Sequence, residues 1–175
     1  MSQRETAPPS CKPIVLGITG ASGAMYAIRL MQSLWHADVD VHLTISPSGA
    51  AVIKQETGLT VDLSRMNLVE LISFVPTWST DRHRQIVEST DWKDRLADRF
   101  YYHRYDDYMT PIASGSFQTS AMVVCPCSGS TLSGIARAAA SNLIQRAAEV
   151  HLKEHRKLVV VPRETPVSVL QLENM

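Results

Sequence analysis

Residues 12–26 read Lys-Pro-Ile-Val-Leu-Gly-Ile-Thr-Gly-Ala-Ser-Gly-Ala-Met-Tyr. The apolar run that ends at Ile18 predicts a strand, and apolar residues at three- and four-residue spacing from Ala24 predict a helix. Glycines at positions 17, 20 and 23 surround the turn between them. The start of a helix presents unpaired N–H groups and the positive end of the helix dipole, so this turn is expected to bind an anion such as a phosphate, with the Ser22 hydroxyl as a further donor. A tight turn that binds no ligand is the alternative.

The chain continues this alternation of strand and helix. Residues 39–45 alternate between apolar and polar types, as a half-buried strand does. Ser46 and Pro47 then predict the N-cap and the first residue of a helix that ends at Gly58. Two apolar runs, at residues 121–127 and 158–161, predict buried strands. Two further stretches, at residues 131–140 and 142–155, predict helices.

This order of elements predicts one α/β domain over residues 12–175. We expect a doubly wound parallel sheet in a three-layer sandwich of the flavodoxin-like or Rossmann-like kind. Ligands of such sheets bind outside the carboxyl ends of the strands. Polar groups suited to a phosphate or a polar ring follow each of these ends, at Gly20 to Gly23, Ser46, Cys127 to Thr131, and Arg163 with Glu164.

Residues 73–110 interrupt the alternation. They hold two of the three tryptophans and four of the five tyrosines. Because six Lys and Arg face seven Asp and Glu here, the segment lacks the basic surface that nucleic acid requires. We expect a surface helix with a packing aromatic face, suited to a subunit contact.

Composition argues against several other classes of protein. Seventeen basic and seventeen acidic residues give a formal net charge of zero, so no nucleic-acid partner is expected. No apolar run approaches the roughly 20 residues that span a bilayer, so no membrane partner is expected. Residues 1–11 lack the apolar core of a signal peptide and are expected to form a disordered leader. Three cysteines cannot form a disulfide framework, which favours the cytoplasm.

A nicotinamide-dependent reductase is a remote alternative. The spacing Gly17-x-x-Gly20-x-x-Gly23 could open a dinucleotide site, and Asp38 or Asp40 lies near the position of the expected ribose ligand. The Tyr-x-x-x-Lys pair that short-chain reductases need for proton transfer is missing from the sequence. A P-loop is excluded because no Gly-Lys-Ser/Thr follows the glycines.

No metal site is predicted. Cys125 and Cys127 would point to the same side of a strand, but two thiols leave a zinc site incomplete, so buried cysteines are expected. His151 and His155 have the i, i+4 spacing of a metal pair, and a solvated helix face is the expected alternative.

Five motifs resemble the UbiX/Pad flavin prenyltransferases and follow the order of that family across residues 13–175. They are Gly-Ile-Thr-Gly-Ala-Ser-Gly-Ala at 17–24, Ser-Gly-Ser-Phe-Gln-Thr at 114–119, Pro-Cys-Ser at 126–128, Arg-Ala-Ala-Glu-Val at 146–150 and Arg-Glu-Thr-Pro at 163–166. Arg-Glu-Thr-Pro after a buried strand, together with Ser-Gly-Ser-Phe-Gln, is highly specific. The related flavin-dependent cysteine decarboxylases share the fold but carry a Pro-Ala-Ser-Ala-Asn-type motif that this sequence lacks.

The resemblance implies a single flavoprotein domain that binds FMN. The family transfers a dimethylallyl group from dimethylallyl phosphate to reduced FMN without a metal, and the prenylated FMN serves UbiD-type decarboxylases. By motif position, the FMN site would be lined by Gly20, Ala21, Ser22, Ser46, Ser128, Gly129, Ser130, Thr131 and Arg163. The catalytic residues would be Ser22, Glu56, Arg146, Lys153 and Glu164. The family's dodecamers imply a homo-oligomer.

These residue types suit the implied chemistry. Prenyl transfer without a metal needs cations to stabilise the departing phosphate, and Arg146 and Lys153 can supply them. Glu164 could relay protons as the new ring closes. From spacing alone, Arg146, Lys153 and Glu154 would be read as solvated helix charges.

The resemblance also covers less than the whole family pattern. The family continues past the Arg-Glu-Thr-Pro helix into another strand and a Pro-Ala-Phe-Tyr segment, whose groups help to hold the prenyl phosphate, whereas this sequence ends at Met175. We therefore expect the chain to bind FMN and its prenyl transfer to be impaired. A non-catalytic FMN-binding or carrier protein is the alternative from another class.

Overall fold

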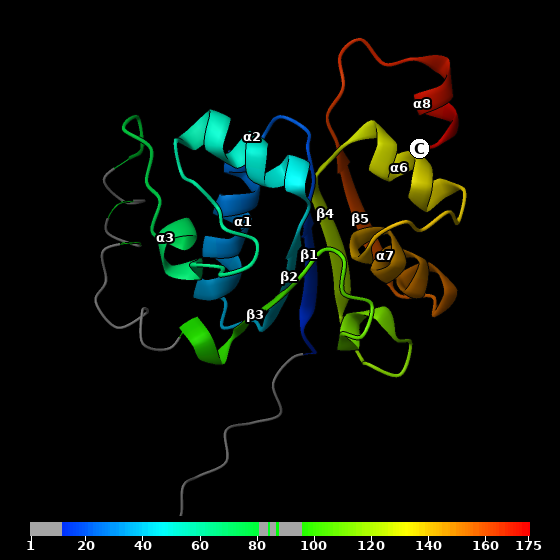
Figure 1. Ribbon diagram of the computed structural model, residues 1–175, viewed down its shortest axis with the longest axis horizontal. Coiled ribbons are helices and arrows are strands. Elements are labelled where there is room, and N and C mark those ends of the chain that lie inside the picture. Colours follow the sequence, from blue (N-terminus) through cyan, green and yellow to red (C-terminus); the bar gives the residue numbers. More distant parts are fainter. Residues whose placement is uncertain (1–11, 81–83, 85–86, 88–95) are drawn as a thin grey trace, which may run out of the picture.

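The computed structural model describes residues 12–80, 84, 87 and 96–175. Its elements alternate along the chain (Figure 1), in the order β1 (Ile14–Ile18), α1 (Ala24–His36), β2 (Val41–Ile45), α2 (Pro47–Thr57), α3 (Leu68–Ile72), the 3-10 turn η1 (Leu96–Asp98), β3 (Phe100–His103), the 3-10 turn η2 (Pro111–Ala113), β4 (Ala121–Cys127), α6 (Gly129–Ala136), α7 (Leu143–Lys153), β5 (Lys157–Pro162) and α8 (Val169–Glu173).

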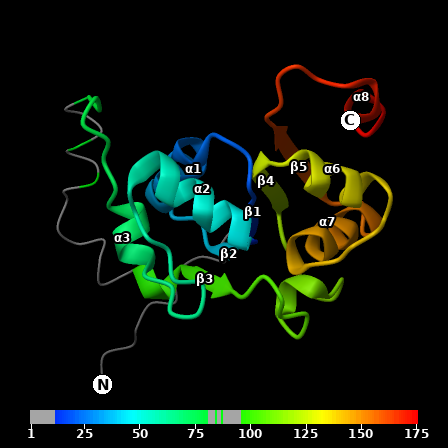
Figure 2. The same ribbon diagram turned by 45° about the horizontal axis from the view of Figure 1, so that its top comes forward.

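The sheet confirms the predicted α/β class. Its five strands have the order β3-β2-β1-β4-β5, and every neighbouring pair is parallel. Helices α1, α2 and α3 lie on one side of the sheet, and α6 and α7 lie on the other (Figures 1 and 2). This gives three layers, and the strand order is that of Rossmann-like sheets.

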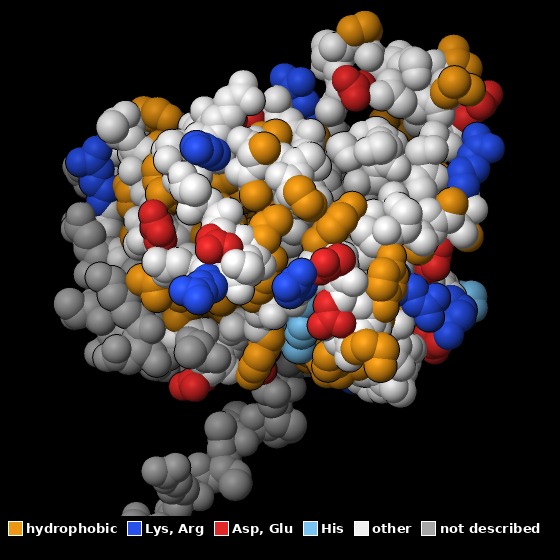
Figure 3. Space-filling view, in the orientation of Figure 1, with side chains coloured by type: hydrophobic (Ala, Val, Ile, Leu, Met, Phe, Trp, Pro, Cys, Tyr) orange, Lys and Arg blue, Asp and Glu red, His pale blue; other side chains and the backbone are white. Residues whose placement is uncertain are grey.

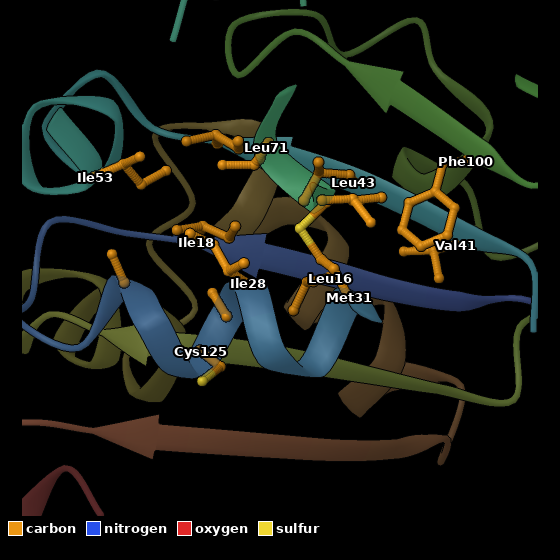
Figure 4. Packing of buried hydrophobic residues seen from close by; sticks show 14 of the residues in the cluster. Leu16, Ile18, Ile28, Met31, Val41, Leu43, Ile53, Leu71, Phe100 and Cys125 are labelled. Carbon is orange, nitrogen blue, oxygen red and sulfur yellow. The ribbon is translucent and has the colours of Figure 1, made fainter. Parts of the chain in front are cut away.

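Each face of the sheet has its own hydrophobic core, because side chains alternate between the faces. Leu16 and Ile18 of β1 pack with Leu43 of β2, with α1 and with α3 on one face (Figure 4). Val15 packs with β4, α6 and α7 on the other face. Gly17 lets α7 approach the sheet, since a Cβ atom there would lie 2.9 Å from Cγ2 of Ile144.

The predicted limits of α2 are confirmed. The helix runs from Pro47 to Thr57, and the hydroxyl of its N-cap, Ser46, accepts the N–H of Gly49 at 3.0 Å. Gly58 ends it with a φ of 80°, in the left-handed region that favours glycine. Capping by the Ser46 side chain and the left-handed conformation of Gly58 therefore define the two ends of this helix.

The predicted surface helix in 73–110 is wrong for residues 100–103, which form the edge strand β3. Tyr102 packs against the core on the α1 side, while Tyr101 stacks on His42 on the other side at a centroid distance of 4.9 Å. Aromatic residues favour strands, where alternate side chains serve two faces. Residues 81–83, 85–86 and 88–95 lie outside the described residues, as does the predicted leader at 1–11.

Strand β5 forms as predicted, but it is not buried. It lies at an edge of the sheet, and Val159 and Val161 are 36% and 39% exposed. Helices α6 and α7 pack against β5 from one face, where Leu158 and Val160 contact the core. An apolar run does not reveal how many neighbours a strand has.

The C-terminal helix α8 also exposes apolar side chains. Val169, Leu170 and Leu172 are exposed, and Figure 3 shows hydrophobic side chains at the upper right, where Figure 1 draws α8 in the same orientation. Within the part of the chain that the structure describes, no helix combines the length and the apolar character needed to cross a membrane.

Both strand cysteines are buried, as predicted, and burial raises the pKa of Cys127 to about 12. The solvated face predicted for His151 is wrong, because its ring is buried between the Thr119 hydroxyl at 2.8 Å and the Ala147 carbonyl oxygen at 2.7 Å. Among residues 12–80, 84, 87 and 96–175, no group of three or more His, Cys, Asp and Glu side chains is placed to hold a metal ion.

Candidate active site

The sheet reverses its strand order between β1 and β4, and polar segments follow both strands. The chain leaves β1 toward β2 and β3 on one side, and passes from β4 to β5 on the other. The segments that follow are Thr19 to Gly23 after β1 and Ser128 to Thr131 after β4. Figure 1 shows that they lie at one edge of the sheet together with the starts of α2 and α6. Open α/β sheets bind ligands at such a reversal.

The start of α6 gathers three hydroxyl groups. Ser128 is the N-cap, and its hydroxyl lies 3.0 Å from the Thr131 hydroxyl and 3.2 Å from the Ser130 hydroxyl. The Ser128 hydroxyl also accepts the backbone N–H of Thr131 at 3.4 Å. A helix start with hydroxyl donors suits a phosphate or the polar edge of a ring.

The start of α2 lies directly against the turn after β1. A Cβ atom on Gly20 would lie 2.5 Å from Cβ of Ser48, so only glycine permits this approach. The hydroxyls of Ser46 and Ser48 are 3.1 Å apart, and the Ser46 N–H donates to the Ile18 carbonyl oxygen at 3.0 Å. These contacts place the predicted flavin residues Gly20 and Ser46 together.

The start of α1 binds a carboxylate of the protein itself, that of Glu56. The N–H groups of Gly23 and Ala24, which we expected to bind a phosphate, donate to the carboxylate of Glu56. Ser22, the residue before Gly23, is exposed, and Ala21 is buried. The prediction that a negatively charged group binds at this helix start therefore agrees with the structure, but the group is the Glu56 carboxylate. The sequence pattern could not identify it, because Glu56 lies 33 residues from Gly23 in the sequence.

The end of β5 reaches the same edge. The N–H of Arg163 donates to the carbonyl oxygen of Cys127 at 3.4 Å, which joins Arg-Glu-Thr-Pro to the end of β4. A Cβ atom on Gly129 would lie 3.7 Å from Oε2 of Glu164. The structure thus brings together the predicted residues Arg163, Glu164 and Gly129, and both charged side chains are exposed.

The predicted cations Arg146 and Lys153 lie elsewhere in the chain. Helices α6 and α7 connect β4 to β5, so the last residue of α7, Lys153, lies near the start of β5, opposite the edge that carries Arg163. Lys153 pairs with Glu154 at 3.0 Å, and Arg146 donates to the carbonyl oxygen of Ala113 at 3.2 Å. Among the residues that the structure describes, no hydrogen bond or ion pair joins either cation to Ser22 or Glu164.

The Ser-Gly-Ser-Phe-Gln-Thr motif lies with these cations. The Glu154 carboxylate packs against Gly115, and Arg156 donates to the carbonyl oxygens of Gly115 and Phe117. The five motifs therefore form two groups. One group surrounds the strand reversal, and the other surrounds α7.

Comparison with known proteins gives a consistent result. The family model described as Flavoprotein matches residues 2–171. Flavin prenyltransferase UbiX of Halalkalibacterium halodurans is 42% identical over 160 residues, which are 91% of this chain and 68% of that protein. The crystal structure of AnUbiX (PadA1) in complex with FMN and dimethylallyl pyrophosphate is similar with a TM-score of 0.69 and 33% identity, over 94% of this chain and 71% of the other.

A second solved structure is also similar. It is the dodecameric FMN-dependent Ubix-like decarboxylase from Escherichia coli O157:H7, with a TM-score of 0.67 and 35% identity. The match covers 93% of this chain and 73% of that chain.

Proposed function

This chain belongs to the UbiX flavin prenyltransferases, and we propose that it transfers a dimethylallyl group from dimethylallyl phosphate to reduced FMN. The observation that carries this proposal is the 42% identity to a flavin prenyltransferase over 91% of the chain. In the reaction, the bond from the allylic carbon to the phosphate oxygen breaks, a bond from that carbon to the flavin forms, and phosphate leaves.

The residues at the strand reversal fit FMN. The starts of α2 and α6 present backbone N–H groups and the hydroxyls of Ser46, Ser128, Ser130 and Thr131, which suit the phosphate and polar ring edge. Gly20 lets Ser48 lie against the turn after β1, and Arg163, whose N–H donates to the carbonyl oxygen of Cys127, supplies a cation at the end of β4. Reduced FMN, when bound, supplies the electron-rich ring that accepts the prenyl group.

Ser22 and Glu164 are proposed to act on the reacting groups. Both are exposed at the strand reversal, where Glu164 lies beside Gly129. The carboxylate of Glu164 can accept and return a proton as the new ring closes. The Ser22 hydroxyl can donate a hydrogen bond to the flavin or to the departing phosphate.

Arg146 and Lys153 are proposed to act from another copy of the chain. Lys153 ends α7 near the start of β5, whereas Glu164 follows the end of that strand, and Arg146 donates to the carbonyl oxygen of Ala113. A homo-oligomer that sets α7 of one copy against the strand reversal of another would bring cations to the departing phosphate, which needs them in the transition state. A dodecamer, as in the similar E. coli protein, is the proposed assembly.

The product's recipient and the location of the enzyme belong to the same proposal. Prenylated FMN would pass to a UbiD-type decarboxylase. The buried free thiols Cys125 and Cys127 suit a reducing compartment and favour the cytoplasm.

Release of inorganic phosphate tests the proposed transfer. The protein is mixed with dimethylallyl phosphate and either reduced or oxidised FMN in the absence of oxygen. Phosphate release only with reduced FMN is expected. A non-catalytic FMN carrier would bind the flavin and release no phosphate with either form.

A further inference from the structure

Glu56 joins the end of one helix to the start of another. It is the residue before the last of α2, and its carboxylate accepts two backbone N–H groups, one of them shared between its two oxygens. The Gly23 N–H lies 2.9 Å from Oε1 and 3.2 Å from Oε2, and the Ala24 N–H lies 2.8 Å from Oε2. Charge-assisted bonds of this kind are stronger than neutral ones, and the helix dipole favours a negative charge at this place.

Helix α1 has no cap of its own to compete with Glu56. Its N-cap is Gly23, which lacks a side chain, and its first turn contains no acidic residue. Gly23 has a φ of 112°, and a Cβ atom there would lie 3.0 Å from Cδ2 of Tyr26. Glycine is therefore required at the position where a capping serine or aspartate would normally stand. The cap has to come from another element.

Helix α2 contacts the turn after β1 at two points. Ser48, in its first turn, lies against Gly20, and Glu56, in its last turn, binds Gly23 and Ala24. Ser48 and Glu56 are about 12 Å apart along the helix. The stretch from Gly20 to Gly23 can span at most about 11 Å, which is similar to that separation. The turn therefore lies along α2 and is held at both ends, with Ala21 and Ser22 between the two contacts.

We propose that Glu56 is a positioning residue, which fixes the flavin-binding turn by capping the start of α1 with its carboxylate. This inference rests on the proposed function, since it assigns the turn from Gly20 to Gly23 to FMN. It changes the role that the family resemblance implied for Glu56, from a group acting on the substrate to one acting through Ser22 and the backbone. It also predicts that the flavin phosphate binds at the start of α2 or α6, because the N–H groups of Gly23 and Ala24 are already bonded.

Removal of the carboxylate and its replacement by a free anion tests this role. In Glu56→Ala we expect FMN affinity to fall by about tenfold, the effect of losing a charge-assisted hydrogen bond. Nitrate and formate, compared at constant ionic strength, are expected to restore affinity and turnover, because both are planar anions that can accept the two N–H bonds. Nitrate does not carry a proton near neutral pH, whereas a carboxylate can. Gln55→Ala, one position earlier on the exposed side of α2, is the matched control and should bind FMN as the wild type does.

Two results would overturn the proposal. In the first, formate restores turnover and nitrate does not, which would make Glu56 a proton carrier. In the second, Glu56→Ala binds FMN with wild-type affinity. If the alanine variant does not fold, Glu56→Gln replaces it, since the amide keeps one acceptor oxygen. The FMN affinity of Glu56→Gln should lie between that of the wild type and that of a protein whose α1 start has no cap. Full affinity with abolished turnover would again indicate that Glu56 transfers a proton.

A measurement without flavin separates this inference from the proposed function. Hydrogen exchange at the amides of Gly23 and Ala24 should be slow in the wild type, fast in Glu56→Ala and slow again with nitrate. Fast exchange in the wild type would overturn the role of Glu56 even if FMN binds. Failure of the wild type to bind FMN, with slow exchange at both amides, would instead contradict the proposed function.

Discussion

The hydroxyl of Thr19 donates to the carbonyl oxygen of Pro126 at 2.8 Å, although 107 residues separate the two in the sequence. The same hydroxyl accepts the N–H of Ser128 at 2.8 Å, and the Thr19 N–H lies 3.2 Å from the Pro126 oxygen. Thr19 is buried. One side chain thus ties the end of β1 to the end of β4, at the strand reversal where the flavin is proposed to bind.

Thr19→Val is expected to destabilise the protein, because it keeps the side-chain shape and removes the acceptor of the half-buried Ser128 N–H. An unsatisfied buried polar group costs about 1–3 kcal/mol. Urea unfolding should show this loss, and FMN affinity should fall with it because Ser128 shifts. Thr60→Val, at an exposed position, is the control. Equal unfolding midpoints for the two variants would contradict the role of Thr19.

Arg163→Ala is expected to weaken FMN binding by about tenfold or more, since a charge-assisted hydrogen bond contributes roughly 1.5–3 kcal/mol. Flavin fluorescence titration measures the effect. Lys157→Ala removes an exposed cation from the opposite end of the same strand and should leave the affinity unchanged. If both variants bind FMN as the wild type does, Arg163 is not a flavin ligand.

Variants of Lys153 and Glu164 test whether one active site is built from residues of two copies of the chain. Lys153→Ala and Glu164→Ala should each abolish most turnover. If the two residues meet across copies, oligomers co-expressed from both variants should recover activity, because some sites then contain both wild-type groups. Purification through a different tag on each variant isolates the mixed oligomers. Mixed oligomers that are as inactive as their parents would place both residues in one chain's site.

Acid is expected to destabilise the fold through His42. Burial and, to a smaller extent, the neighbouring His103 together lower its pKa to about 4. The unfolded value is about 6.5, so neutral His42 contributes stability that is complete above about pH 6.5 and is lost as the pH falls toward 4. Burial lowers the pKa of His103 and His151 as well, which acts in the same direction.

Urea unfolding at several pH values measures this effect. The free energy of unfolding should fall between about pH 6.5 and 4.5, and it should fall less in His42→Phe, which keeps a ring against Tyr101 and cannot gain a proton. Parallel pH profiles for the wild type and His42→Phe would contradict this explanation.

Local signals predicted much of this structure. Ser46, Pro47 and Gly58 set the ends of α2 because capping and glycine geometry depend on neighbours in the sequence. The contact of Glu56 with Gly23 and that of Thr19 with Pro126 could not be read in this way, since each joins residues far apart in the chain. The family resemblance named Glu56, and only the fold shows what its carboxylate binds.

Two features depend on the tertiary arrangement: the exposed edge position of β5 and the separation of Lys153 from Glu164. An apolar run such as 158–161 is compatible with a central or an edge strand, and the position of β5 in the sheet decides between them. Residues 153 and 164 stand 11 apart in the sequence, yet the full length of β5 separates them. Motif matching assigns residues to a reaction and does not tell which copy supplies them.

The mass of the flavin after a single turnover tests the proposed reaction most directly. The protein is held in excess over reduced FMN, with dimethylallyl phosphate and without oxygen, so that even a slow transfer converts the bound flavin. Mass spectrometry should then show FMN heavier by one dimethylallyl unit, and only when protein, reduced flavin and prenyl donor are all present. Recovery of unmodified FMN from protein shown to bind both ligands would contradict the proposed prenyl transfer.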